Sequence, residues 1–218
     1  LGYRPAEHNL RLGALEAIGS GLTLAQDDLV LPGSFVSLYN ERIVDPTAGR
    51  LSGDEAAVLL GDLHAAIADP SIRLHALRGH RFLVIVGGGR EFRVETVAPQ
   101  VAGRQAVREL YPHGSDAGRL GRLLDQARRV LADHDINRVR VDLGENPANF
   151  VWLWGAGGRG ALPWFRDVHR VGGAAVTGAP LGKGVAHLTG LELSPLDGVT
   201  GATNTDLAAK ARQAISML

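Results

Sequence analysis

The residues of this sequence best suited to chemistry are arginines that lie beside turns. The segment Asp45-Pro46-Thr47-Ala48-Gly49-Arg50 places a carboxylate and a guanidinium at the two ends of one turn. Arg81 opens an apolar run, where a guanidinium is costly to bury unless it is paired. Because the guanidinium fork matches a carboxylate or a phosphate, Asp45, Arg50 and Arg81 are candidate residues for an anionic substrate.

Each of these residues also has a purely structural interpretation. Asp45 could cap the turn at Thr47 while Arg50 is solvated. An internal Asp or Glu could be the partner of Arg81. At the level of the sequence both interpretations stay open.

Three more polar residues lie close to predicted strands or loops. Arg140 and Asn149 come shortly before the apolar segment at Phe150, where polar side chains could line a cleft. Lys183 stands between two glycines in a predicted strand-to-helix loop and could meet an anion at a helix N-terminus. The alternatives are backbone capping by Asn149, a surface position for Arg140 and a bystander role for Lys183.

Several other kinds of chemistry are excluded by composition and motif. The chain has no cysteine, so it has no disulfide, no thiolate zinc site and no cysteine nucleophile. It has neither a His-x-x-x-His pair nor a Gly-x-Ser-x-Gly motif. Its 23 Lys and Arg balance its 23 Asp and Glu, so no overall field draws it to nucleic acid or to an anionic membrane. The residues therefore predict a local anion-binding surface without a catalytic centre.

Local patterns predict the elements that would position these residues. A capping box at Ser52 and Glu55 begins a helix over 54–68, and an amphipathic stripe predicts a helix over 116–134. Residues 136–143 fit a helix or a strand. The other elements expected before Pro147 are a helix at 12–18, a strand at 34–40 and a hairpin of strands 72–77 and 80–86. We expect the two long helices to cover these strands around one core.

After Pro147 the predicted strands alternate with helices. They are a strand at 150–154, a helix at 162–170, a strand at 173–177, a helix at 181–188 and a closing helix at 206–217 capped by Thr205. This alternation predicts an α/β fold with a parallel, doubly wound sheet. With 218 residues, 45% of them hydrophobic, the chain is one large domain or two small ones, and no apolar stretch approaches the ~20 residues of a membrane span.

Motifs continue in order along the chain from the 45–50 segment onward. They are Asn137-x-x-Arg140-x-x-x-Gly144-x-x-Pro147-Ala148-Asn149, Trp152-Leu153-Trp154-Gly155-x-Gly157, Leu181-Gly182-Lys183-Gly184 and Gly198-x-Thr200-Gly201. This ordered set resembles the archaeal-type, cofactor-independent phosphoglycerate mutases of the alkaline phosphatase superfamily.

The resemblance implies an α/β fold in which a substrate-clamp domain, residues 31–140, is inserted into a doubly wound, phosphatase-like core. Residues 1–30 and 141–218 would be flanking parts of that core. In this family a serine nucleophile and two divalent metals transfer a phosphoryl group between the 2- and 3-positions of phosphoglycerate. The metals would be Mn²⁺, Mg²⁺ or Zn²⁺ in a full-length parent protein.

The resemblance also implies what this chain itself contributes. The family's nucleophile and metal ligands match no part of it, so we expect a central fragment that binds substrate but holds no metal and no catalytic residue. Its first residue is Leu1 and its only methionine is Met217, which also suggests an internal piece. The implied partners are a phosphorylated small molecule and the rest of the parent chain, without nucleic acid or membrane, in the cytoplasm.

Pro32 and Gln100 depart from the residues that the family tends to have. These departures keep two other functions open. One is a non-catalytic binding or regulatory module of the same fold. The other is a related metal-dependent phosphatase or a phosphonate-processing enzyme.

Overall fold

The computed structural model describes residues 1–4, 8, 11–89, 91–98, 106–194, 199–202 and 204–217. The chain divides into two compact units, which are described one at a time. The central unit comprises Asp27–Ala156, and the flanking unit comprises Leu1–Gln26 with Gly157–Leu218. The division falls outside the predicted 31–140 segment on both sides.

The central unit is built on an antiparallel sheet around one long strand, β1, which pairs with β2, β4 and β5, while β3 pairs with β4. The strands are β1 Leu29–Tyr39, β2 Arg42–Asp45, β3 Ile72–Ala76, β4 Arg81–Val86 and β5 Phe150–Leu153. The predicted hairpin is confirmed as β3 and β4. The predicted strand at 34–40 is confirmed and begins earlier, at Leu29.

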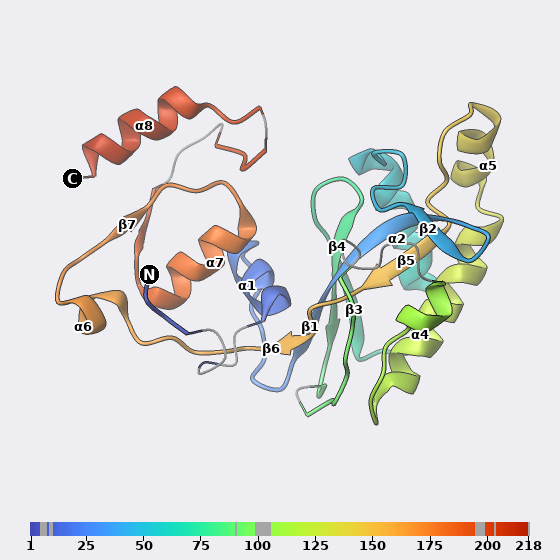
Figure 1. The fold of residues 1–218 in the computed structure, drawn as a ribbon, viewed down its shortest axis with the longest axis horizontal. Helices are drawn as coiled ribbons and strands as arrows, with labels where there is room; N and C mark the ends of the chain where they lie inside the picture. The colour runs from blue at the N-terminus through green and yellow to red at the C-terminus, as the bar shows by residue number, and fades with distance from the viewer. Residues whose placement is uncertain are drawn as a thin grey trace. The chain divides into compact units, whose positions relative to one another are not determined.

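Two helices lie on the same side of this sheet, α2 (Gly53–Ala66) and α4 (Ala117–Ala132) (Figure 1). Leu59 and Leu63 of α2 and Leu124 of α4 are buried in one cluster with Phe82 of β4. The capping box is present, with Ser52 and Glu55 bonded to each other reciprocally. The expected core shared by two helices and the sheet is therefore confirmed, and Trp152 and Trp154 are also buried.

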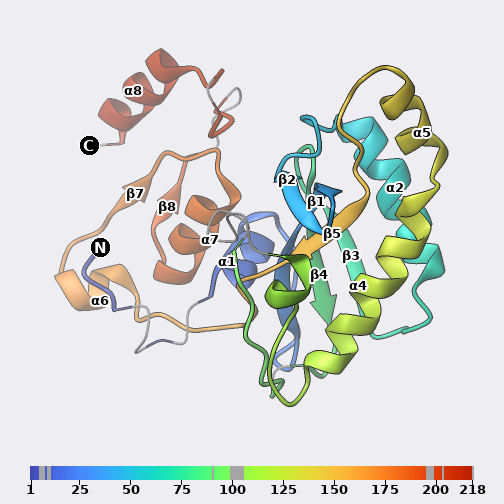
Figure 2. The same cartoon turned by 45° about the vertical axis from the view of Figure 1, so that its right-hand side comes forward.

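Two shorter helices complete the central unit. The ambiguous segment near Ile136 is a helix, α5 (Asp135–Asp142), which lies beyond the end of α4 in both views (Figures 1 and 2). The buried amide of Asn137 binds the carbonyls of Leu131 and Ala148 and accepts from the Ala148 N–H. This amide joins the end of α4 to the segment that leads into β5. A short 3₁₀ helix, η2, spans Val107–Leu110.

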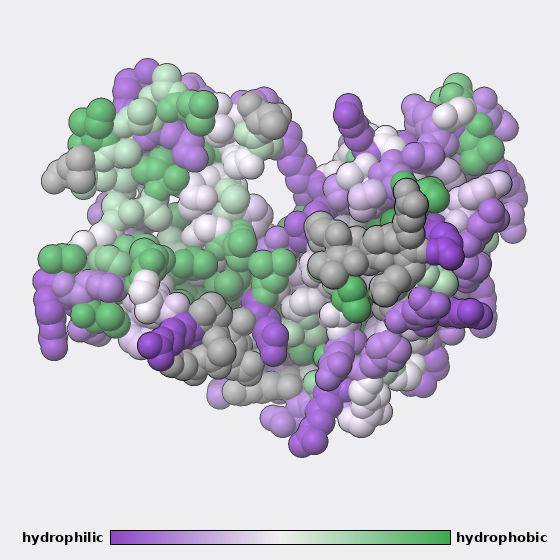
Figure 3. Space-filling model, viewed as in Figure 1, coloured by the Kyte–Doolittle hydropathy of each residue, from purple (hydrophilic) through white to green (hydrophobic). Residues whose placement is uncertain are grey.

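The flanking unit is made of short elements. They are α1 Leu12–Gly19, β6 Gly157–Gly158, α6 Phe165–His169, β7 Ala174–Ala175, α7 Pro180–Thr189, β8 Glu192–Leu193 and α8 Leu207–Ser216. Helices α1 and α7 approach closely because both present glycine: a Cβ on Gly184 would lie 1.9 Å from the Leu15 carbonyl oxygen. Helices α6 and α8 bury no residue, and hydrophobic side chains show at the surface of this unit (Figure 3). The α1–α7 contact is thus its main packing.

The mixed α/β class is confirmed, but details of the predicted second half are corrected. Strands β7 and β8 are parallel, but β5 runs antiparallel to β1 in the central sheet. Alternation of strands and helices along the chain therefore did not set strand direction here. Helix α6 and strand β7 are shorter than predicted. Helix α8 is capped by Asp206, whose carboxylate accepts from the Ala209 N–H, and not by Thr205, whose hydroxyl accepts from the Thr200 N–H.

Candidate anion-binding site

The loop between β2 and α2 has an unusual backbone. Three successive residues have positive φ angles: Ala48 at 48°, Gly49 at 65° and Arg50 at 57°. This left-handed region costs a residue with a side chain roughly 1 kcal/mol or more, and such strain concentrates at functional sites. Ala48 is also fully buried. The loop keeps this conformation because the surrounding side chains hold it.

Asp45 holds the loop from its first residue. Its carboxylate accepts hydrogen bonds from the Thr47 N–H (2.8 Å), the Thr47 hydroxyl (2.7 Å), the Gly49 N–H (2.8 Å) and the Asn146 amide (2.9 Å). Burial by itself would raise the pKa of Asp45, but these hydrogen bonds outweigh it and lower the pKa to about 2. The structure therefore supports the capping interpretation of Asp45, and its oxygens are occupied within the protein.

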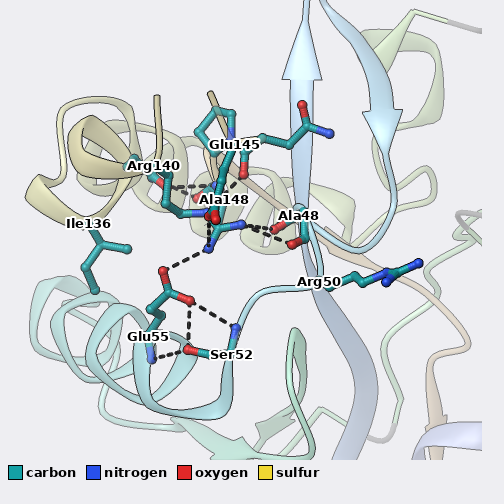
Figure 4. Close-up of polar contacts among 12 residues, drawn as sticks. Ala48, Arg50, Ser52, Glu55, Ile136, Arg140, Glu145 and Ala148 are labelled. Carbon is teal, nitrogen blue, oxygen red and sulfur yellow. Dashed lines mark hydrogen bonds and ion pairs between the residues drawn. The ribbon is translucent and has the colours of Figure 1, made fainter. Parts of the chain in front are cut away.

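Arg140 holds the same loop from α5. Its side chain is 4% exposed, and its N–H groups all point at protein acceptors (Figure 4). The acceptors are the Ala48 and Gly49 carbonyls at 3.0 and 3.2 Å, the Asn146 carbonyl at 3.0 Å, Glu55 at 2.8 Å and Glu145 at 3.1 Å. A guanidinium has five N–H donors, so none is left for a ligand. Arg140 therefore has a buried, structural role, in contrast to the substrate contact suggested by its sequence position.

Arg50 is presented in the opposite way. Its residue is exposed, and its side chain points away from the Arg140 cluster (Figure 4). Its backbone N–H donates to the Thr47 hydroxyl at 3.3 Å. Within the part of the chain that the structure describes, its guanidinium makes no hydrogen bond or ion pair. The loop thus offers a complete guanidinium fork to an anion.

The turn between β3 and β4 lies next to this loop. A Cβ on Gly79 would be 3.4 Å from the Leu51 carbonyl oxygen. Arg81, half-buried, places its guanidinium carbon 5.2 Å from the centre of the Trp154 ring. The pKa of His80 is lowered by burial and by the nearby charge of Arg81, against the attraction of Asp45. The loop and the turn therefore form one surface region that carries Arg50, Arg78 and Arg81.

The two remaining candidates do not join this region. The Asn149 amide pairs with the backbone of Leu38, accepting from its N–H at 2.7 Å and donating to its carbonyl at 3.0 Å. This is the backbone-capping alternative. Lys183 is exposed on α7 and belongs to the flanking unit. Its predicted contact with an anion stays a prediction.

The sequence interpretation missed three contributors to the site. Glu55 was noted only as a capping residue, yet it also binds Arg140. Asn146 binds Asp45, and His80 lies beside Arg81. Asn146 lies between Gly144 and Pro147 in the motif that runs from Asn137 to Asn149, and His80 directly precedes Arg81, so both had a usable sequence signal. The bond between Glu55 and Arg140 joins residues 85 positions apart and had none.

Metal-binding and membrane-spanning features can be tested only where side chains and helices are described. Among those residues there is no group of three or more His, Cys, Asp or Glu that could hold a metal ion, so the described side chains do not fit a metal site. No described helix is both long enough and apolar enough to cross a bilayer.

Pro32 lies within β1, where its carbonyl accepts from the Trp154 N–H, and Gln100 and Gly198 lie outside the described residues.

A sequence model of the family described as 2,3-bisphosphoglycerate-independent phosphoglycerate mutase matches residues 1–137. The chain belongs to this family. It is 30% identical to the phosphoglycerate mutase of Methanosarcina mazei and 33% identical to that of Pyrococcus horikoshii. Each alignment covers 100% of this chain but only 55% and 54% of the relative. The chain therefore spans about half the length of the phosphoglycerate mutases that it matches.

Solved structures agree with the family assignment. A protein from Pyrococcus horikoshii superposes with a TM-score of 0.70 at 27% identity, over 99% of this chain and 50% of the other. The cofactor-independent phosphoglycerate mutase of Thermoplasma acidophilum superposes with a TM-score of 0.61 at 27% identity, over 90% and 55%. The predicted family resemblance is confirmed, while the assignment to the alkaline phosphatase superfamily stays a prediction.

Proposed function

We propose that this chain is the substrate-binding central part of an enzyme that interconverts 2- and 3-phosphoglycerate. The family match supports the reaction class. The observation that carries the local role is the strained loop that presents Arg50 outward next to the Arg81 turn. Phosphoglycerate carries a phosphate and a carboxylate, and both are acceptors for a guanidinium fork.

In this proposal the residues of the chain bind and orient, while phosphoryl transfer depends on the rest of the parent protein. Arg50 contacts one anionic group of the substrate from the exposed end of the loop. Arg81, kept in place over Trp154, adds a second positive charge in the same region. The divalent metals expected in the full-length parent, Mn²⁺, Mg²⁺ or Zn²⁺, supply stabilisation of the charge that develops during transfer. A cytoplasmic location stays a prediction.

The proposal is tested by titrating the ¹⁵N-labelled 218-residue chain with 3-phosphoglycerate and following amide shifts by NMR, a method suited to weak binding. We expect shifts at the 45–51 loop and the 78–81 turn. Arg50→Ala should weaken binding by about 1 to 3 kcal/mol, the scale of one charge-assisted hydrogen bond. Arg129→Ala, which removes an exposed arginine from α4, is the matched control and should leave binding unchanged.

Turnover is measured on the same protein with 3-phosphoglycerate and Mn²⁺ or Mg²⁺. We expect no activity above a control without protein, because the chain would lack the nucleophile and the metal ligands. Activity in this assay would contradict the proposal that phosphoryl transfer depends on the rest of the parent protein. Equal binding by the Arg50→Ala variant and the unmodified chain would remove Arg50 from the site.

A further inference from the structure

We propose that Arg140 and Glu55 are positioning residues that set the direction of Arg50 by fixing the backbone between them. This inference rests on the proposed role of Arg50 in anion binding. It assigns to Arg140 a task different from direct contact with substrate. The loop, the helix α2 and the helix α5 meet at this pair (Figure 4).

The first step is the contact of Arg140 with the strained residues. One nitrogen, Nη2, donates to the carbonyls of both Ala48 and Gly49, the two residues that precede Arg50. Position 49 must be glycine for two reasons: its φ is +65°, and an added Cβ would lie 2.5 Å from Nη2 of Arg140. The guanidinium therefore packs directly against the loop backbone, which restricts the peptide planes that aim Arg50.

The second step is the anchoring of Arg140 itself. Glu55 uses one carboxylate oxygen for Nη1 of Arg140 at 2.8 Å and the other for the N–H and hydroxyl of Ser52, at 3.1 and 2.7 Å. One side chain thus caps α2 and holds the guanidinium. Because α2 is packed into the core through residues such as Leu59, the loop is held in a fixed position relative to a rigid helix.

The strained loop does more than connect β2 to α2. A loop that only joined β2 to α2 could relax its two non-glycine residues out of the left-handed region. Here the network fixes Ala48 in that region and leaves the Arg50 side chain outside all of its hydrogen bonds. The strain is therefore retained next to a residue that faces outward, as expected for preorganisation of a binding group.

The experiment is a double-mutant cycle on 3-phosphoglycerate binding by the 218-residue chain. Arg140→Lys keeps the charge but cannot reach both carbonyls and both carboxylates at once. It should weaken binding about three- to tenfold, the size of coupling measured within one hydrogen-bonded network. In the Arg50→Ala background the same substitution should produce no further change. Glu55→Gln repeats the cycle with α2 intact and serves if Arg140→Lys does not fold.

A control separates positioning from general loss of stability. Leu124→Ala removes a buried side chain of α4 that takes no part in the hydrogen bonds of Arg140 and Glu55, and the melting temperature of this variant provides the comparison. We expect it to lower Tm while leaving binding by the folded chain unchanged at a temperature well below Tm. Weakening by Leu124→Ala equal to that by Arg140→Lys would overturn the positioning role.

The outcomes distinguish the two proposals. If Arg50→Ala has no effect on binding, the proposed function of the site fails and the positioning role fails with it. If Arg50→Ala weakens binding but Arg140→Lys does not, only the positioning role fails. The positioning role also fails by itself if Arg140→Lys weakens binding equally with and without Arg50.

Discussion

Replacing Arg140 by alanine should destabilise the central unit strongly. The side chain is 4% exposed and serves five acceptors. Three of the acceptors are backbone carbonyls, of Ala48, Gly49 and Asn146. The bond to the Ala48 carbonyl is buried, and a buried carbonyl left without its donor costs about 1 to 3 kcal/mol; the bonds to Gly49 and Asn146 are partly buried, and their loss costs less. The two carboxylates, Glu55 at 31% and Glu145 at 50% exposed, can turn to water and add little.

Together these terms give an expected loss of about 3 to 5 kcal/mol in the free energy of unfolding. That is a large fraction of the ~5 to 15 kcal/mol typical of a domain. The assay is equilibrium unfolding in urea, followed by tryptophan fluorescence, since Trp152 and Trp154 are buried in the central unit. Far-ultraviolet circular dichroism provides a second probe of the same transition.

Arg138→Ala is the matched control for this measurement. Arg138 lies on the same helix, is 63% exposed and pairs with Asp135 at i and i−3. A surface pair of this kind contributes about 0 to 0.5 kcal/mol, so the midpoint should barely move. A loss below about 1 kcal/mol for Arg140→Ala, or equal losses for both variants, would refute the view that Arg140 holds the loop.

Three further predictions concern the Asp45 carboxylate and two glycines, one in β1 and one in α2. Because the folded-state pKa of Asp45 is lowered to about 2, its contribution to stability is present above the ordinary value of 3.8 and is lost as pH falls toward 2. Asp45→Asn should therefore flatten the stability curve in that window, measured by urea unfolding at several pH values; an unchanged curve would contradict it. Gly33→Ala should cost about 1 to 3 kcal/mol, because its Cβ would lie 2.4 Å from the Phe82 ring. Gly61→Ala, whose new Cβ would point into open space on α2, should instead raise the free energy of unfolding by about 0.5 to 1 kcal/mol in the same assay. If Gly33→Ala were the more stable of the two variants, β1 and β4 would have to move apart at little cost.

The parts of this protein that the sequence determined are those written in neighbouring residues. The capping box from Ser52 to Glu55 spans only four residues, so it could be recognised without knowledge of the fold. The leucine stripe of α4 repeats at helical spacing and predicts both the helix and its buried face. The family was also readable, because its motifs are short and ordered along the chain.

Tertiary structure alone decided strand direction and the roles of the arginines. Strand β5 runs antiparallel to β1 because of its pairing with residues more than 110 positions earlier, which no local pattern encodes. Arg140 meets Ala48 across 92 positions and Glu55 across 85, so its burial could not be inferred from its neighbours. The sequence showed which residues carry charge. The fold determined that Arg140 donates to backbone carbonyls while the nearby Arg50 side chain faces outward. The reason is that the acceptors of Arg140 come from segments distant in the sequence.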